Sequence, residues 1–350
     1  MESYRQSRIR RTAEQFERAW RVAASCGATD LELSARFWHG AALHGEGRLS
    51  EALAVWAPVL ATDTPGRLGG DYYMMLTRYV LVAVDLPLPL GVIERALAAV
   101  EERAARSSGH GARSRLLLAR SRLALARGNA RESLELGLEG LVRRRIEHHA
   151  YSYSTHYRTL TQAGLLAGEP DLVEDLLDEW DGMEPDYPEA KRIALATARA
   201  GLARCRDNPD EAIAHLEAVM DGALRSEEVG PAVDASCEYV RVTAAAGVPV
   251  RARPAVRYLL RFRRASMGAL RFRAMLMLGD YHAACARSAG DERSAQPMVR
   301  AVRSYEAARS EAVRIDELLV TSYRRDQIAR RLASGFSPGG TRGPSADSGG

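Results

Sequence analysis

The stretch RFWHGAALHGEGRLSEALAVWAPVLATDTP, residues 36–65, decides the fold. Two amphipathic segments meet in it at the turn Gly47-Arg48-Leu49, which predicts a pair of antiparallel helices. Small residues at Gly40 and Ala52 stand where the two helices must approach closely, and Trp56 supplies the bulk beside them. One such hairpin cannot bury its apolar face alone, so the fold depends on whether the pattern recurs.

The pattern does recur, as a small residue, a Gly or Asp at the turn, an acid followed by a small or apolar residue, and large apolar residues at helical spacing. It returns in residues 119–141, 161–180 and 198–220. Two further turns, at Gly247 and Gly290, share the motif Gly-x6-Pro-x-Val-Arg at an interval of 43 residues. Equivalent positions are therefore 37 to 44 residues apart, which predicts a stack of about seven hairpins.

Two of the copies carry the residues of a known repeat. The first has Gly40, Gly47, Glu51-Ala52-Leu53, Trp56 and Pro65, and the fourth has Ala200, Asp207, Glu211-Ala212-Ile213, Leu216 and Val219. On these residues the sequence resembles the tetratricopeptide repeat (TPR) family. The resemblance implies an all-α, right-handed superhelical solenoid of about seven antiparallel helical hairpins, with ligands held along its inner groove.

We expect three parts in the chain. Residues 1–28 form an N-terminal cap helix, residues 29–333 the TPR-like helical-repeat domain, and residues 334–350 a disordered tail with almost nothing to bury. The last helix should run unbroken from about Pro297 to Leu332. Its outer half keeps a row of apolar residues, which either caps the solenoid or docks a second copy as a homodimer through the C-terminal helix.

Composition excludes several classes of protein. No run of 18 apolar residues and no secretory signal occurs, so we expect a cytoplasmic protein without a membrane segment. No Cys-x2-Cys spacing predicts a metal site, no cofactor motif is present, and no nucleophile or phosphate-binding motif predicts an enzyme. The use of one lysine against 48 arginines suggests a GC-rich bacterial genome.

Charge is uneven along the chain. Residues 161–238 contain 19 acids and 6 bases, whereas residues 241–334 contain 8 acids and 19 bases. Such a dipole either joins neighbouring repeats or protomers, or it steers a charged partner.

The TPR resemblance selects positions on the first helix of each hairpin as the groove. Several of these positions are polar, and arginine recurs among them: Arg122, Arg158, Gln162, Arg204, Arg241 and Arg287. Guanidinium groups bind carboxylates with two parallel hydrogen bonds, so we expect a protein partner or an acidic peptide segment there. A second cluster, with His149, Tyr153 and His156 on one helix face, is either a polar rim of the groove or ordinary packing between hairpins.

The basic C-terminal third offers an alternative, nucleic-acid binding. Arginines alternate there with aromatic residues, at Arg257, Arg261, Arg264, Arg271 and Arg273. No signature of a nucleic-acid-binding fold accompanies them. The sequence therefore favours a non-catalytic protein- or peptide-binding scaffold acting as an adaptor or regulatory subunit, with a peptide-responsive transcriptional or signalling regulator and nucleic-acid binding as alternatives.

Overall fold

The computed structural model describes residues 9–46, 48–61, 69–86, 88–106, 110–145, 153–183, 188–226, 229–263, 268–289 and 295–335. Within these ranges the chain forms sixteen α-helices, one 3-10 helix and no strand. The helices are α2 (Ile9–Ser25), α3 (Thr29–Gly45), α4 (Leu49–Ala61), α5 (Gly69–Asp85), α6 (Leu90–Arg106), α7 (His110–Ala126), α8 (Ala130–Arg145), α9 (Tyr153–Ala167), α10 (Pro170–Asp181), α11 (Pro188–Cys205), α12 (Pro209–Arg225), α13 (Val229–Ala245), η1 (Pro249–Ala252), α14 (Arg253–Leu260), α15 (Gly268–Ala289), α16 (Ala295–Leu318) and α17 (Tyr323–Gly335).

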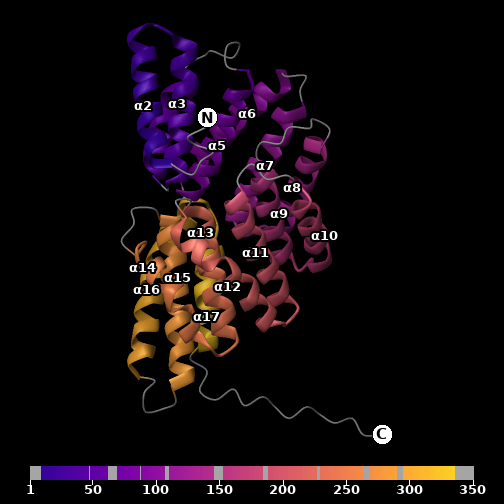
Figure 1. Cartoon of the computed structure of the whole chain (residues 1–350), viewed down its shortest axis with the longest axis vertical. Coiled ribbons are helices and arrows are strands. Elements are labelled where there is room, and N and C mark those ends of the chain that lie inside the picture. Colours follow the sequence, from indigo (N-terminus) through magenta and orange to yellow (C-terminus); the bar gives the residue numbers. More distant parts are fainter. Residues whose placement is uncertain are drawn as a thin grey trace.

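These helices form the predicted row of hairpins. The pairs α3/α4, α5/α6, α7/α8, α9/α10, α11/α12 and α15/α16 each pack as neighbours, and in the sixth hairpin η1 and α14 together replace the second helix beside α13. Helix α2 packs along α3, as expected of a cap. The described helices thus give seven hairpins, which α2 precedes and α17 follows in the chain; α17 lies back among the later hairpins (Figure 1). The right-handed course of the superhelix stays a prediction.

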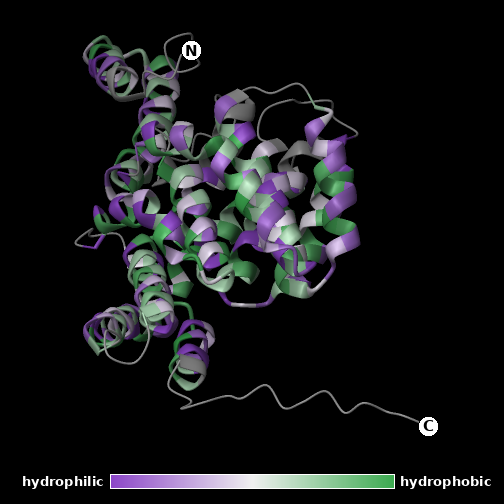
Figure 2. Ribbon diagram, turned by 60° about the horizontal axis from the view of Figure 1, so that its bottom comes forward, coloured by the Kyte–Doolittle hydropathy of each residue, from purple (hydrophilic) through white to green (hydrophobic). Residues whose placement is uncertain are grey.

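The first helices of the hairpins form one continuous layer. Each of α3, α5, α7, α9, α11, α13 and α15 contacts the next in that series, whereas contact between successive second helices is slight. A row that is packed more tightly on one side curves toward that side, and α15 accordingly contacts α5. We call the concave side of this layer the inner face. Each helix carries both hydrophobic and hydrophilic residues (Figure 2), as a helix between two neighbours and solvent requires.

One turn geometry ends many of the helices. A residue with positive φ follows the helix at Gly27, Gly128, Gly168, Asp207 and Gly247, and the next amide N–H donates to a carbonyl five residues back. This is the left-handed C-cap for which glycine is favoured, because it has no Cβ to clash with the backbone. Of the turn glycines named from the sequence, Gly247 therefore marks a true helix end, whereas Gly47 and Gly290 lie outside the described residues.

The predicted unbroken helix over residues 297–332 is wrong, because the same turn recurs at Val320. Val320 has a φ of +52°, and the Thr321 amide donates to the Asp316 carbonyl at 2.8 Å. The buried Asp316 carboxylate then accepts from the amides of Arg324 (3.0 Å) and Arg325 (2.9 Å), which caps the first turn of α17. This turn contains no glycine, so the sequence pattern does not predict it.

Helix α17 folds back onto its own chain. The Thr321 hydroxyl donates to the Arg127 carbonyl at 2.9 Å, and the Tyr323 ring lies against Gly128, so the start of α17 reaches the turn between α7 and α8. Farther along, Ile328 is buried and Arg331 donates to both carboxylate oxygens of Asp280 on α15, at 2.9 and 3.1 Å. The apolar face that suggested a homodimer is therefore taken up by packing within the chain.

The remaining parts of the expected tail and cap lie outside the described residues. Residues 1–8 precede α2, and residues 336–350 follow α17. Ser334 and Gly335, which the sequence assigned to the disordered tail, instead end α17.

The close approach predicted for the first hairpin is confirmed. Trp56 is fully buried and its indole N–H donates to the Phe37 carbonyl at 3.1 Å. A Cβ placed on Gly40 would lie 2.2 Å from that indole nitrogen, so glycine is required there. The last hairpin repeats the arrangement, because a Cβ on Gly279 would lie 2.4 Å from the Tyr305 ring.

Gly40→Ala should therefore lower the free energy of unfolding by about 1–3 kcal/mol, because the added methyl must displace the buried Trp56 ring. Gly91→Ala is the matched control, since the nearest atom to its new Cβ is the Arg95 guanidinium at 3.7 Å; a change within about 0.5 kcal/mol is expected. Urea denaturation of both variants measures the difference. Equal effects would contradict the close-approach account.

Val320→Gly should raise the free energy of unfolding by about 1 kcal/mol. A β-branched residue at positive φ is strained by about 1–3 kcal/mol, whereas glycine adopts this conformation without strain. The same substitution at Val299, which is exposed within α16, should lower it by about 0.5–1 kcal/mol through loss of helix propensity. Chemical denaturation of the two variants would show opposite signs. A loss of stability in both would mean that Val320 is not strained.

Candidate functional site

The inner face carries two carboxylates, one turn apart on α13, that are each held by two arginines. Asp234 accepts from Arg158 on α9 and from Arg273 on α15. Glu238 accepts from Arg204 on α11 at 2.6 Å and from Arg241 on α13 itself at 2.9 Å. We call these six residues the α13 ion cluster. It joins four of the first helices across the inner face, including α9 and α13, which are not neighbours in the row.

A third group extends the cluster toward the N-terminal hairpins. Arg122 on α7 donates to Asp85 at the end of α5 and to the side-chain carbonyl of Gln162 on α9, both at 3.3 Å. Three of the predicted groove positions, Arg122, Gln162 and Arg158, therefore lie on the same inner face through α7 and α9.

Burial and charge together fix the ionisation of the cluster. Burial alone would raise the pKa of Asp234, but the two guanidinium groups of Arg273 and Arg158 outweigh it and hold the pKa well below its usual value. For Glu238 burial likewise opposes ionisation, and Arg241 and Arg204 again lower its pKa. Four guanidinium groups against two carboxylates leave the α13 ion cluster with a surplus of two positive charges.

The pKa of His44, at the C-terminal end of α3, is affected by the same positive charges. Its pKa is lowered to about 4, first by burial and then by the positive charge of Arg78, with Arg158 and Arg122 adding to it and Asp85 opposing it. A histidine that is neutral at pH 7 among arginines accepts or donates a hydrogen bond without adding charge. The inner face thus offers cationic donors and a neutral imidazole to a ligand.

Helix α17 bounds this site at its C-terminal end. Arg331 of α17 binds Asp280 of α15, and the Arg324 guanidinium lies 5.9 Å from the ring centre of Phe272 on α15. Helix α17 therefore packs against the part of α15 that carries Phe272 and Asp280, whereas Arg273 of the same helix belongs to the α13 ion cluster.

Other predicted site residues do not join the cluster. Arg287 lies exposed at the last turn of α15. His156 is fully buried between hairpins, with a Cβ on Gly140 coming 3.5 Å from its ring, so its predicted place on the groove rim is wrong and packing between hairpins is its role. His149 and the side chain of Tyr153 lie outside the described residues.

The five arginines of the nucleic-acid alternative are divided among different surroundings. Arg273 belongs to the α13 ion cluster, and Arg271 pairs with Glu311 of α16 at 3.1 Å. Arg257 and Arg261 are exposed on and just after α14, with Arg261 over the Tyr258 ring at 5.3 Å, and Arg264 lies outside the described residues. The two that face the solvent freely are those of the α14 segment.

Sequence reasoning missed the acids of the site. Asp85, Asp234 and Glu238 also lie on first helices, and each pairs with an arginine of another hairpin at a separation of 37, 39 or 34 residues, which is close to one repeat. Opposite charges at the repeat interval were therefore a usable signal.

Within the described residues, no group of three or more His, Cys, Asp or Glu side chains gathers as a metal site requires. None of the helices that the structure describes is long and apolar enough to cross a bilayer.

Comparison with known proteins gives one kind of match. No family model matches the sequence, and no curated protein matches it either. Among solved structures, the chain is similar to the crystal structure of NprR in complex with its cognate peptide NprX. The TM-score is 0.53 at 11% identity, over 88% of this chain and 89% of that chain. At this identity the likeness shows the fold alone: this chain is an all-helical, helical-repeat protein.

The lowered pKa of His44 makes stability depend on pH. Between about pH 6.5 and 4, His44 is protonated in the unfolded chain but stays neutral in the folded chain. The free energy of unfolding should therefore fall as the pH falls through this window. His44→Gln removes the imidazole that titrates in this range. The variant should therefore show a difference in unfolding free energy between pH 7 and pH 4.5 that is smaller by about 1–3 kcal/mol. Equal pH dependence in the wild type and the variant would contradict the assignment.

Proposed function

We propose that this protein is a non-catalytic regulatory scaffold that binds a short anionic peptide segment along its inner face. The observation that carries the proposal is the α13 ion cluster, in which four arginines surround two carboxylates and leave a net positive charge. A peptide carboxylate can bind a guanidinium edge that the protein's own acids leave unused, since each guanidinium has five N–H donors.

The position of the cluster supports a peptide rather than a small ion. It joins the first helices α9, α11, α13 and α15, so an extended segment can contact several hairpins at once. The similar NprR structure holds a peptide, NprX, on a related fold. A regulatory role follows physically, because a ligand that bridges several hairpins changes the small angles between them, and these changes add along the row.

Display of random peptides of five to ten residues with free C-termini tests the proposal. Enriched peptides should carry a carboxylate that is required for binding, and the double variant Arg158→Ala/Arg204→Ala should weaken them at least about tenfold. Each cluster carboxylate keeps one arginine in that variant, Arg273 or Arg241, so the fold should persist.

Arg257→Ala/Arg261→Ala is the matched control, because it also removes two arginines but from the exposed α14 segment. Its peptide affinity should equal that of the wild type. Absence of enrichment, or equal loss in both double variants, would reject the inner face as the site. Binding of nucleic acid that depends on Arg257 and Arg261 instead would support the alternative function.

A further inference from the structure

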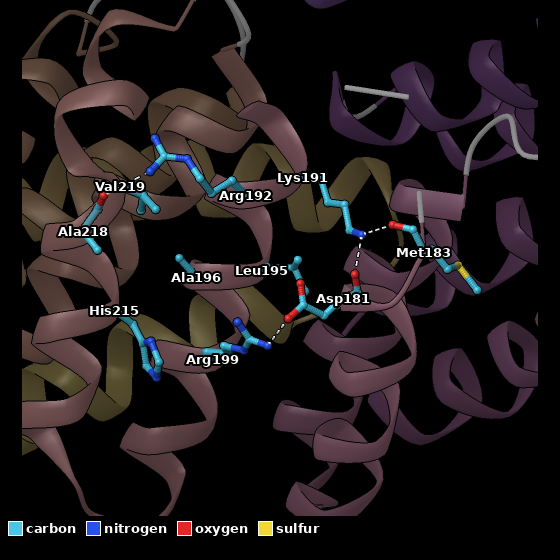
Figure 3. Close-up of a pocket in the computed structure, with 10 residues that line it drawn as sticks. All are labelled: Asp181, Met183, Lys191, Arg192, Leu195, Ala196, Arg199, His215, Ala218 and Val219. Carbon is cyan, nitrogen blue, oxygen red and sulfur yellow. Dashed lines mark hydrogen bonds and ion pairs between the residues drawn. The ribbon is translucent and has the colours of Figure 1, made fainter. Parts of the chain in front are cut away.

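A cavity lies away from the inner-face cluster, where the end of α10 meets α11 and α12 (Figure 3). Its volume is about 460 Å³, within the range of small-ligand sites. Helix α10 ends at Asp181, and Asp181 and Met183 line the cavity on that side. The small side chains of Ala196 and Ala218 line it on α11 and α12.

The floor of the cavity is apolar. Leu195 and Ala196 of α11 and Val219 of α12 line it, and all three are buried side chains of the hairpin core. An apolar ligand body would gain contact there without displacing any polar partner.

Basic residues are concentrated at the rim of the cavity, although the surrounding sequence is acidic. Residues 161–238 contain 19 acids and 6 bases, yet three of those six bases, Lys191, Arg192 and Arg199, line this cavity together with His215. Asp181 is the acidic residue among the lining side chains. Glu189 pairs with Arg192 at 2.8 Å, and Glu211 lies 3.6 Å from His215. Arg199 is therefore the basic side chain of the rim that is best placed to bind a small anion.

The basic side chains of the rim make different contacts. Lys191 is buried and its ammonium donates to the carbonyls of Asp181 (3.0 Å) and Met183, so it holds the end of α10 in position. Arg199 donates one N–H group to the Asp181 carboxylate at 2.7 Å, in a pair of which both side chains are substantially exposed. Exposed pairs of this kind are held weakly, so a ligand anion can share or take over the guanidinium.

Arg199 and His215 lie at one end of the cavity, and Arg192 lies two helical turns away at the other, with Leu195 and Ala196 between them (Figure 3). That separation is about 10 Å along α11. The layout therefore has a polar end, an apolar floor and a second polar end.

We propose that this cavity binds a small carboxylate with an elongated apolar body, such as a medium-chain fatty acid. The carboxylate lies between Arg199 and His215, and the body lies over Leu195, Ala196 and Val219. This site is independent of the peptide site on the inner face, since none of its residues belongs to the α13 ion cluster. The protein would then have a second input, a metabolite, besides its peptide.

The fluorescent anion 8-anilinonaphthalene-1-sulfonate tests the site, with sodium decanoate as competitor. The full-length protein should bind one equivalent of the dye saturably and release it to decanoate. The uncharged analogue N-phenyl-1-naphthylamine, which has the same ring system, should bind at least about tenfold more weakly.

Two pairs of variants separate the cavity from general surface binding. Ala218→Trp fills the cavity and should abolish dye binding, whereas Glu217→Trp, exposed on α12 and not among the lining residues, should leave dye binding intact. Arg199→Gln should weaken both dye and decanoate about tenfold, whereas Arg225→Gln at the end of α12 should leave them unchanged. Circular dichroism melts confirm that each variant is folded.

Three results would overturn the proposal: no saturable dye binding, dye binding that Ala218→Trp leaves intact, or equal affinity for the charged and uncharged dyes. The peptide-display measurement is unaffected by any of them, so failure of this site and failure of the inner-face site are distinguishable.

Discussion

Two carboxylates on α13, each shared by two arginines, are the constraint on which the inner face depends. A buried carboxylate is costly unless it is paired, so each of the two needs at least one of its arginines. Because the arginines around Asp234 come from α9 and α15, the pairing links hairpins that are not neighbours in the row. The curvature of the row and the ionisation of its inner face are therefore coupled.

The same coupling supplies a physical mechanism for the proposed response to a ligand. A solenoid has few contacts between distant repeats, so its shape is governed by neighbouring interfaces and by the few bridges that span them. Here the bridges are ion pairs, which an anionic ligand can compete for, and α17 adds a further bridge through Thr321 and Arg127. A ligand that alters these pairings would change the spacing of several hairpins together.

Much of the fold could be predicted from the sequence because several residues of the repeat are required by the backbone conformation or by close packing. Glycine at the left-handed turns and at Gly40, against Trp56, is required by geometry, so its recurrence located the hairpins correctly. The end of α16 could not be found this way. Val320 occupies a turn position that glycine normally marks, and its strain is offset by Asp316, whose role appears only once α17 has folded back.

Sequence reasoning named arginines at first-helix positions but not the acids that pair with them. The structure places Arg158, Arg204 and Arg241 in shared ion pairs with Asp234 and Glu238. Arg273 was assigned to a nucleic-acid surface, because its partner Asp234 lies 39 residues away in sequence. His156, by contrast, shares a helix with Arg158 yet faces the core, which spacing alone does not reveal.

The most direct test of the account is a crystal structure of the protein with a peptide selected by display. The account predicts that a carboxylate of the peptide lies within hydrogen-bonding distance of Arg158, Arg204, Arg241 or Arg273 on the inner face, with Asp234 and Glu238 still paired. A peptide seated on the outer helices, with no arginine of the cluster in contact, would contradict it.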